Sequence, residues 1–279
     1  MIQEAEARAR FADLMSGSDD EIELDRVALT IAQGEYAQLE PAPYLRRLDE
    51  MAAELRPRLS PEEPAGRLIA ELNAFLFGEE AFHGNTVDYY DPRNSYLNDV
   101  LDRRTGIPIS LSVVYIELAR RLRLQIEGVG LPGHFIVRCP SGSDTLLVDP
   151  FNQGAMLSHE DCAERIRQLY GNSLPFSPEL LRPVSRREIA TRMLNNLKGC
   201  YLRRGDLGRA LRSVEWGRLA DPSRPDDLRE QGLLRFRLGD FRGAAADLER
   251  YLETQAGGVL ADQTRAQLRQ VEDLWARRN

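Results

Sequence analysis

The first 60 residues place their apolar side chains at the spacing of helix faces. From residue 22 to residue 32, apolar positions recur every three or four residues, and the Ser and Asp residues at 18–20 are typical of a helix start. A second helix is predicted over residues 43–55. Residues 60–63 contain Ser, Pro and Glu in the order that suits a helix N-terminus, so a third helix is predicted to begin there. Its buried stripe is predicted to comprise Leu68, Ile69, Leu72, Phe75 and Leu76.

The middle of the chain changes from helical spacing to alternation. A turn at residues 103–106 separates a shorter helix from a long one, whose apolar positions between 111 and 122 lie along one side. Apolar and polar residues then alternate, which is typical of strands in an antiparallel sheet. Strands are predicted over residues 125–130, 134–139 and 145–149, and the last two form a hairpin.

Two polar residues stand at the ends of that predicted hairpin. His134 begins one strand and Asp149 ends the other, so antiparallel pairing brings their side chains together. A histidine and a carboxylate on successive strands, with a helix N-terminus upstream, is the arrangement of cysteine-type acyl-transfer sites. The helix start offers no thiol. Its hydroxyls are Ser110 and Ser112, and a serine at such a position is more often a cap than a nucleophile.

The segment from residue 82 to residue 95 is rich in turn formers and aromatic residues. Two interpretations are open. The loop either forms a wall of a binding pocket, or it is a structural turn whose Asn and Asp side chains bond to backbone groups. For any single residue of this loop the structural interpretation is favoured.

A repeat emerges in the last third of the chain. Gly-Asp-Leu at 205–207 recurs as Gly-Asp-Phe at 239–241, and this period of 34 is typical of paired antiparallel helices. A capping helix is predicted over residues 260–275. Two units and a cap are too few for independent stability, so the repeats are expected to lean on the preceding domain.

Charge and cysteine content narrow the classes of partner. The 279 residues carry a formal charge of −7, from 37 basic and 44 acidic residues that are interspersed. This excludes an electrostatic footprint for nucleic acid or an anionic membrane and favours protein or small-molecule partners. Cys139, Cys162 and Cys200 give neither a disulfide framework nor zinc spacing, so no cofactor or metal is expected. Because no apolar leader or membrane-spanning stretch occurs, a cytoplasmic protein is expected, with its oligomeric state left open.

Three short blocks carry a family resemblance. Gly-Ile-Pro at 106–108, Pro-Gly-His-Phe at 132–135 and Val-Asp-Pro at 148–150 resemble the blocks of the transglutaminase-like superfamily, in which a cysteine opens the helix and a histidine and an aspartate follow. The longer stretches NSYLNDVLDRRTGIPISL and GVGLPGHFIVR resemble the first member of the bacterial SirB family. In that family a transglutaminase-like core precedes tetratricopeptide repeats, and the resemblance covers roughly residues 22–252.

The resemblance implies roles for individual residues. His134 matches the family base and Asp149 its orienting acid, whereas Pro108 falls where the cysteine would be. Proline has no nucleophilic atom, so thiol acyl transfer is not expected. Cys139 is no substitute, because alternation places it on the opposite face of the strand from His134, where it is expected in the core.

These observations predict an α+β protein: a helical N-terminal region on a transglutaminase-like (cysteine-protease-like) core with a small antiparallel sheet, then an all-α tetratricopeptide-like module. The proline-rich residues 175–183 mark the predicted boundary between residues 1–174 and 184–279. The favoured function is a cytoplasmic scaffold or regulatory protein that binds a protein or peptide through its repeats. The alternative is a hydrolase or amide-processing enzyme that uses His134 and Asp149 with Ser110 or water. A third is a small-molecule sensor whose pocket opens to the repeats. Acidic partner groups are expected at Arg203, Arg204, Arg235 and Arg237.

Overall fold

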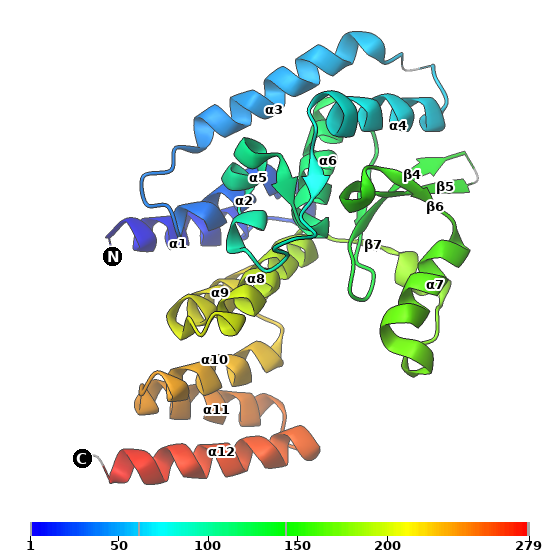
Figure 1. The fold of residues 1–279 in the computed structure, drawn as a ribbon. Helices are drawn as coiled ribbons and strands as arrows, with labels where there is room; N and C mark the ends of the chain where they lie inside the picture. Colours follow the sequence, from blue (N-terminus) through cyan, green and yellow to red (C-terminus); the bar gives the residue numbers. More distant parts are fainter. Residues whose placement is uncertain (1, 61, 143, 278–279) are drawn as a thin grey trace.

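Helices make up most of the computed structural model, which describes residues 2–60, 62–142 and 144–277. Four α-helices precede the first strand among the described residues, and the fourth continues into a π-helical turn, η3 (Ala74–Glu79). Proline in the first turn of the third helix suits that position, because its missing N–H has no partner there in any helix. These helices are α1 (Ile2–Leu14), α2 (Leu24–Gln33), α3 (Pro41–Leu55) and α4 (Ala65–Asn73) (Figure 1).

Two helix starts differ from the sequence prediction. The acidic residues at 19–21 form a short 3-10 turn, and the Asp19 carboxylate accepts the backbone N–H groups of Arg186 and Arg187, each at 2.9 Å. Asp19 therefore caps a distant helix rather than α2. The predicted start at residues 60–63 is wrong, because Pro64 stands in an extended conformation and α4 begins only after it. Position 61 of that prediction lies outside the described residues.

The centre of the molecule is the buried helix α6 (Pro108–Arg121) beside an antiparallel sheet. The strand order is β6-β5-β4-β3-β7, and Val137 of β4 pairs with Val148 of β5. A short parallel pair, β1 (His83–Gly84) with β2 (Thr105–Gly106), covers the start of α6. The remaining central elements are α5 (Leu97–Arg103), β3 (Glu127–Val129), β4 (Ile136–Ser141), β5 (Asp144–Asp149), β6 (Ala155–Leu157), α7 (His159–Tyr170) and β7 (Pro183–Val184).

The sheet is buried on both faces, as the alternation of its residues requires. Phe135, Val137 and Cys139 belong to the main core with α6, whereas Ile136 and Leu147 pack with residues of α7. Cys139 therefore lies in the core, as predicted. Figure 1 shows α7 on the side of the sheet away from α6.

The C-terminal part is a stack of paired helices that descends from the body to α12 at its far end (Figure 1). This confirms the predicted α+β fold with a small antiparallel sheet and an all-helical C-terminal module. The glycines at 205 and 239 have positive φ (72° and 83°) and form the turn within each pair. The five helices are α8 (Arg186–Arg203), α9 (Leu207–Ala220), α10 (Pro225–Arg237), α11 (Phe241–Thr254) and α12 (Val259–Ala276).

The first helix pair belongs to the main core. Trp216 of α9, 2% exposed, packs on Phe11 with ring centroids 5.1 Å apart. The hydroxyls of Tyr96 and Tyr201 lie 2.6 Å apart, which joins the segment before α5 to α8. Moreover, β7 follows the proline-rich connector directly and pairs with β3. The division into residues 1–174 and 184–279 stays a prediction about folding units.

The later helices have a smaller core of their own. Ala244, Ala245 and Leu248 of α11 cluster with Val271 of α12. Small residues at the first two positions let neighbouring helices approach closely. Arg235, expected to face a partner, instead binds Asp247 and Glu215 inside the stack, each at 2.9 Å.

Candidate functional site

The start of α6 is closed by a serine cap. Pro108 is the first helical residue, and the Ser110 hydroxyl accepts the N–H of Ile107 at 3.0 Å. The same hydroxyl donates its proton to the carbonyl of Asn94 at 2.6 Å and is 1% exposed. A Cβ on Gly106 would lie 2.6 Å from this oxygen, so the glycine makes the close approach possible. Ser110 therefore has neither a free proton nor access to a substrate.

His134 and Asp149 lie together at one end of the hairpin. Nε2 of His134 is 2.8 Å from Oδ2 of Asp149, and both side chains are buried. His134 itself precedes β4, which begins at Ile136, so the prediction that it starts the strand is off by two residues. The backbone N–H of His134 donates a hydrogen bond to the carbonyl of Leu131 at 3.0 Å, which closes the turn over residues 131–134. Within the described residues, the Ser110 hydroxyl bonds to backbone groups of Ile107 and Asn94 and not to this pair.

Asp149 accepts hydrogen bonds from several directions. Its Oδ1 accepts the backbone N–H groups of Phe151 and Asn152 at 3.1 and 3.3 Å, which starts the 3-10 turn η5 (Pro150–Asn152). Its Oδ2 accepts the Asn152 amide at 2.7 Å and the Arg165 guanidinium at 3.2 Å in addition to His134. Burial alone would raise the pKa of Asp149, but the bonds from His134 and Asn152 and the charge of Arg165 lower it overall.

An ionised Asp149 fixes the tautomer of its partner. Since a carboxylate only accepts, Nε2 of His134 must carry the proton of this hydrogen bond, and in the neutral form of the ring Nδ1 then holds the lone pair. Nδ1 makes no hydrogen bond with the described residues, and the His134 side chain is buried. The pair is thus oriented as a base would be, without a nucleophile beside it in the described structure.

The first repeat helix holds the turn that carries His134. One guanidinium nitrogen of Arg192, in α8, donates to the carbonyls of Leu131 and His134, each at 2.6 Å. The same guanidinium lies over the ring of Phe135 at 5.4 Å, and burial lowers the pKa of Arg192. The phenyl ring of Phe151 packs against the His134 imidazole in a T-shaped arrangement. The ring centroids are 6.1 Å apart, and the angle between the ring planes is 85°.

The loop between residues 82 and 95 is mainly structural. Asn85 accepts the N–H groups of Val87 and Asp88 at 3.1 and 2.9 Å, and the Asn94 amide donates to the carbonyl of Asp88 at 2.7 Å. Two tyrosines of the same loop remain exposed, and Arg203 of α8 lies 4.0 Å over the ring of Tyr90. The loop therefore also touches the repeats.

Sequence reasoning missed three residues around the pair: Asn152, Arg165 and Arg192. The first has a local pattern, because an Asn three residues after an Asp-Pro step suits a capped turn. The two arginines come from α7 and α8, far along the chain, and no local pattern connects them to the hairpin.

The surroundings of the three cysteine thiols do not activate them as nucleophiles. Cys139, Cys162 and Cys200 are all buried. Burial raises the pKa of Cys139, and it raises the pKa values of Cys162 and Cys200 to about 11. A nucleophilic cysteine needs a lowered pKa and access to solvent.

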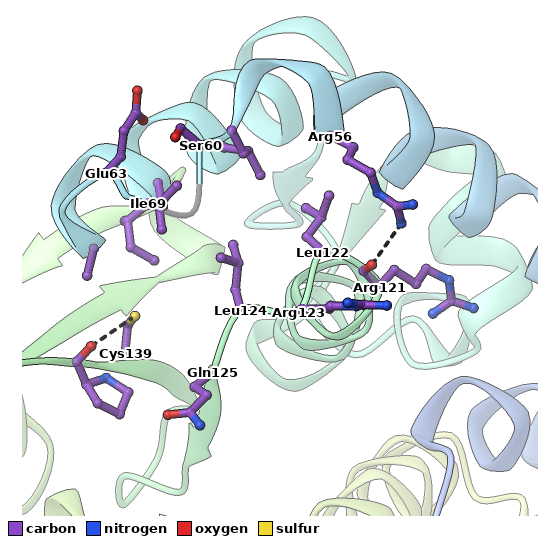
Figure 2. Close-up of a pocket in the computed structure, with 14 residues that line it drawn as sticks. Arg56, Ser60, Glu63, Ile69, Arg121, Leu122, Arg123, Leu124, Gln125 and Cys139 are labelled. Carbon is purple, nitrogen blue, oxygen red and sulfur yellow. Dashed lines mark hydrogen bonds between the residues drawn. The ribbon is translucent and has the colours of Figure 1, made fainter.

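In the part of the chain that the structure describes, no group of three or more His, Cys, Asp and Glu side chains could hold a metal ion. Within the same residues no helix is long and apolar enough to cross a bilayer. A cavity of about 900 Å³ lies between α4, β4 and the end of α6, and His134 does not line it (Figure 2).

These features together define a transglutaminase-like domain joined to helical repeats. They are a helix start, a His–Asp pair on a small antiparallel sheet, and a stack of paired helices that follows. A family model described as Transglutaminase-like superfamily matches residues 42–195, and one described as Tetratricopeptide repeat matches residues 197–269. The chain belongs to the transglutaminase-like superfamily and, within it, to the UPF0162 proteins.

Relatives cover the chain to different extents. A UPF0162 protein of Xylella fastidiosa (strain 9a5c) is 37% identical over 91% of this chain and 92% of its own length. One of Pseudomonas aeruginosa is 34% identical over 69% and 70%. F-box only protein 21 of Homo sapiens is 32% identical over 51% of this chain, which is 23% of that protein. No solved structure matches the chain.

Proposed function

We propose that this chain is a cytoplasmic interaction or scaffold protein whose transglutaminase-like domain does not catalyse acyl transfer. The observation that carries the proposal is the closed start of α6. Pro108 stands at the first helical position, and the Ser110 hydroxyl is bonded to the carbonyl of Asn94. Acyl transfer needs a nucleophile beside the base, and neither residue can act as one. The finer assignment to the SirB family remains a prediction.

The role of His134 and Asp149 is then structural. Asp149 caps η5 and accepts three side-chain donors, while His134 stands in the turn held by Arg192. A buried carboxylate with all its acceptor capacity in use is stabilising, because each donor it satisfies would otherwise be unpaired. This is sufficient to explain the geometry of the pair without a reaction.

The partner surface that we propose is the inner face of the repeats, formed by α8, α10 and α12. Lys198 of α8 ion-pairs with Glu230 of α10, and Arg229 of α10 bonds to Thr264 of α12 at 3.0 Å, so these first helices of successive pairs lie side by side. The polar character of this inner face suits a protein or peptide with charged and amide groups.

The chemical part of the proposal is tested with covalent probes. The full chain is treated with a serine-directed fluorophosphonate and a thiol-directed chloroacetamide and mapped by peptide mass spectrometry. We expect no labelling at Ser110 in the folded protein. Labelling at Ser110 that disappears in both Ser110→Ala and His134→Ala would overturn the non-catalytic role.

The interaction part is tested by quantitative cross-linking in the cells that make the protein. We expect Lys198→Glu to reduce the set of cross-linked partners, because it reverses a charge on the inner face. His134→Ala should leave that set unchanged. The matched control is Arg242→Glu, the same type of reversal on the exposed surface of α11. If Lys198→Glu and Arg242→Glu retain the same partners as the unmodified protein, the inner face is not the binding surface.

One observation favours a second function, hydrolysis of an ester or amide by water. The unbonded Nδ1 of His134 is a base whose orientation is fixed by Asp149, and water needs no side-chain nucleophile. A panel of small ester and amide substrates tests this function. Turnover that is lost in His134→Ala and kept in Ser110→Ala would support it, and absence of turnover would exclude it for those substrates.

A further inference from the structure

The cavity of about 900 Å³ is a separate feature from the His–Asp pair. Its lining comes from the end of α3, the start of α4, the segment after α6 and β4, and includes no residue of α8 to α12 (Figure 2). Cavities of 300 to about 1,000 Å³ are typical of sites for small molecules. A sensor pocket that opens to the repeats, one expectation from the sequence, is not what this cavity provides.

One end of the cavity is apolar. Ile69 and Leu124 extend between α4 and β4, and the Cys139 thiol lies beside them (Figure 2). The leucines at 59, 68, 122 and 124 are only half-buried, so their side chains expose hydrocarbon to the cavity. Apolar surface of this kind is stabilised when a ligand removes it from water.

The other end of the cavity is cationic. Arg56, Arg121 and Arg123 gather around the C-terminal end of α6 (Figure 2). Arg121 is neutralised by Asp25 and Asp49, and Arg56 donates to the carbonyl of Arg121 at 3.0 Å, which offsets the negative end of the helix dipole. Arg123 makes no side-chain hydrogen bond or ion pair with the described residues.

The arginine without a partner is also held in an unusual conformation. Arg123 has φ of 61°, in the left-handed region that non-glycine residues rarely adopt. Neither Arg56 nor Arg123 pairs with a carboxylate of the described chain. The acidic residue of the lining is Glu63, whose side chain points away from the cavity in Figure 2.

We propose that this cavity binds a small amphipathic carboxylate, with the carboxylate on Arg123 and the hydrocarbon chain between Ile69, Leu124 and Cys139. An anionic head group suits the charged end because Arg56 and Arg123 have no acidic partner among the described residues. A hydrocarbon chain suits the opposite end because Ile69 and Leu124 lie there (Figure 2). This binding function is additional to the proposed scaffold role and does not depend on it.

The experiment uses the full chain and decanoate as the probe, followed by calorimetry and methyl NMR. We expect saturable binding with shifts confined to the leucine methyls of the cavity, and weaker binding at high salt because the contact is ionic. Arg123→Gln should weaken the affinity about tenfold, since a charge-assisted hydrogen bond is lost. Arg46→Gln is the matched control, because Arg46 is exposed on α3 outside the cavity and should leave the affinity unchanged.

Two ligand controls separate the parts of the proposal. Decylamine has the same chain with a cationic head and should not compete with decanoate, and acetate has the head without the chain and should bind at least a hundredfold more weakly. Equal binding of decylamine and decanoate, or an unchanged affinity in Arg123→Gln, would overturn the anion site. No leucine shifts with decanoate would overturn the small-molecule site altogether and leave a segment of a partner protein as the occupant.

Discussion

Replacing Asp149 with asparagine tests whether the His–Asp pair is structural. The substitution keeps the shape of the side chain but removes its charge and turns one acceptor oxygen into a donor. Oδ1 can still cap the N–H groups of Phe151 and Asn152. Oδ2 now accepts from His134, Asn152 and Arg165 at 2.8, 2.7 and 3.2 Å, and an amide NH₂ at that place would face three donors.

The size of the effect follows from those contacts. A hydrogen bond to a charged group contributes about 1.5–3 kcal/mol, and Oδ2 of Asp149 accepts three such bonds. Arg165 is 32% exposed and can be rehydrated, and the Asn152 amide can rotate, so part of the loss is recovered. We expect Asp149→Asn to lower the free energy of unfolding by about 3 kcal/mol at pH 7.

The same reasoning fixes the pH dependence. The folded-state pKa of Asp149 is lowered, so its stabilisation is complete above the unfolded-state pKa of about 3.9 and is lost as the pH falls through the folded-state value. The difference between Asp149→Asn and the unmodified protein should therefore shrink below about pH 4. Urea unfolding followed by circular dichroism at pH 7 and in acid measures both quantities.

The matched control is Asp144→Asn on the same strand. Asp144 is exposed at the start of β5, so this change should stay within about 0.5 kcal/mol at every pH. If Asp149→Asn is as stable as Asp144→Asn at pH 7, the carboxylate does not hold the hairpin and the structural role of the pair is refuted.

Three further predictions concern packing and the repeats. Gly154→Ala should lower the free energy of unfolding in urea by about 2–3 kcal/mol, because φ is 73° and the new Cβ would lie 2.4 Å from the Asn73 side chain. The control Gly142→Ala, at φ of 62° in open space, should lower it by only about 1 kcal/mol. Equal losses of stability in the two variants would contradict the steric argument. Trp216→Ala should lower the free energy of unfolding by about 3–5 kcal/mol, because α9 shares the main core. The unfolding midpoints measured by circular dichroism and by the fluorescence of the remaining tryptophan should shift together. An unchanged circular dichroism midpoint would show that the repeats unfold separately. Arg235→Ala should cost about 2 kcal/mol because it leaves buried Asp247 without its guanidinium, whereas Arg237→Ala, an exposed arginine on the same helix, should stay within about 0.5 kcal/mol; the reverse order would show that Arg235 faces solvent.

Local patterns predicted the elements whose causes are local. The alternation from His134 to Cys139 gave the correct faces of β4. The apolar spacing after Gly106 predicted a helix buried along one side, and this was too little, because every residue from Pro108 to Ala119 is buried. The predicted start of α4 was wrong. The Ser-Pro-Glu pattern at 60–63 suits a helix N-terminus, but the extended Pro64 that follows it is the residue after which α4 begins. Arg165 and Arg192 could not be assigned from sequence, because a long polar side chain reaches the hairpin only after α7 and α8 have packed on it.

Arg192 connects the repeat module to the His134 turn by direct hydrogen bonds. Because one guanidinium nitrogen serves the carbonyls of both Leu131 and His134, a displacement of α8 would break two charged hydrogen bonds together. The far side of the same turn is held by Asp149 through Nε2 of the imidazole. The turn is thus fixed from the sheet by the carboxylate and from the repeats by the guanidinium. A histidine and an aspartate therefore have a physical use apart from any reaction, since they set the shape of the turn that the first repeat helix binds.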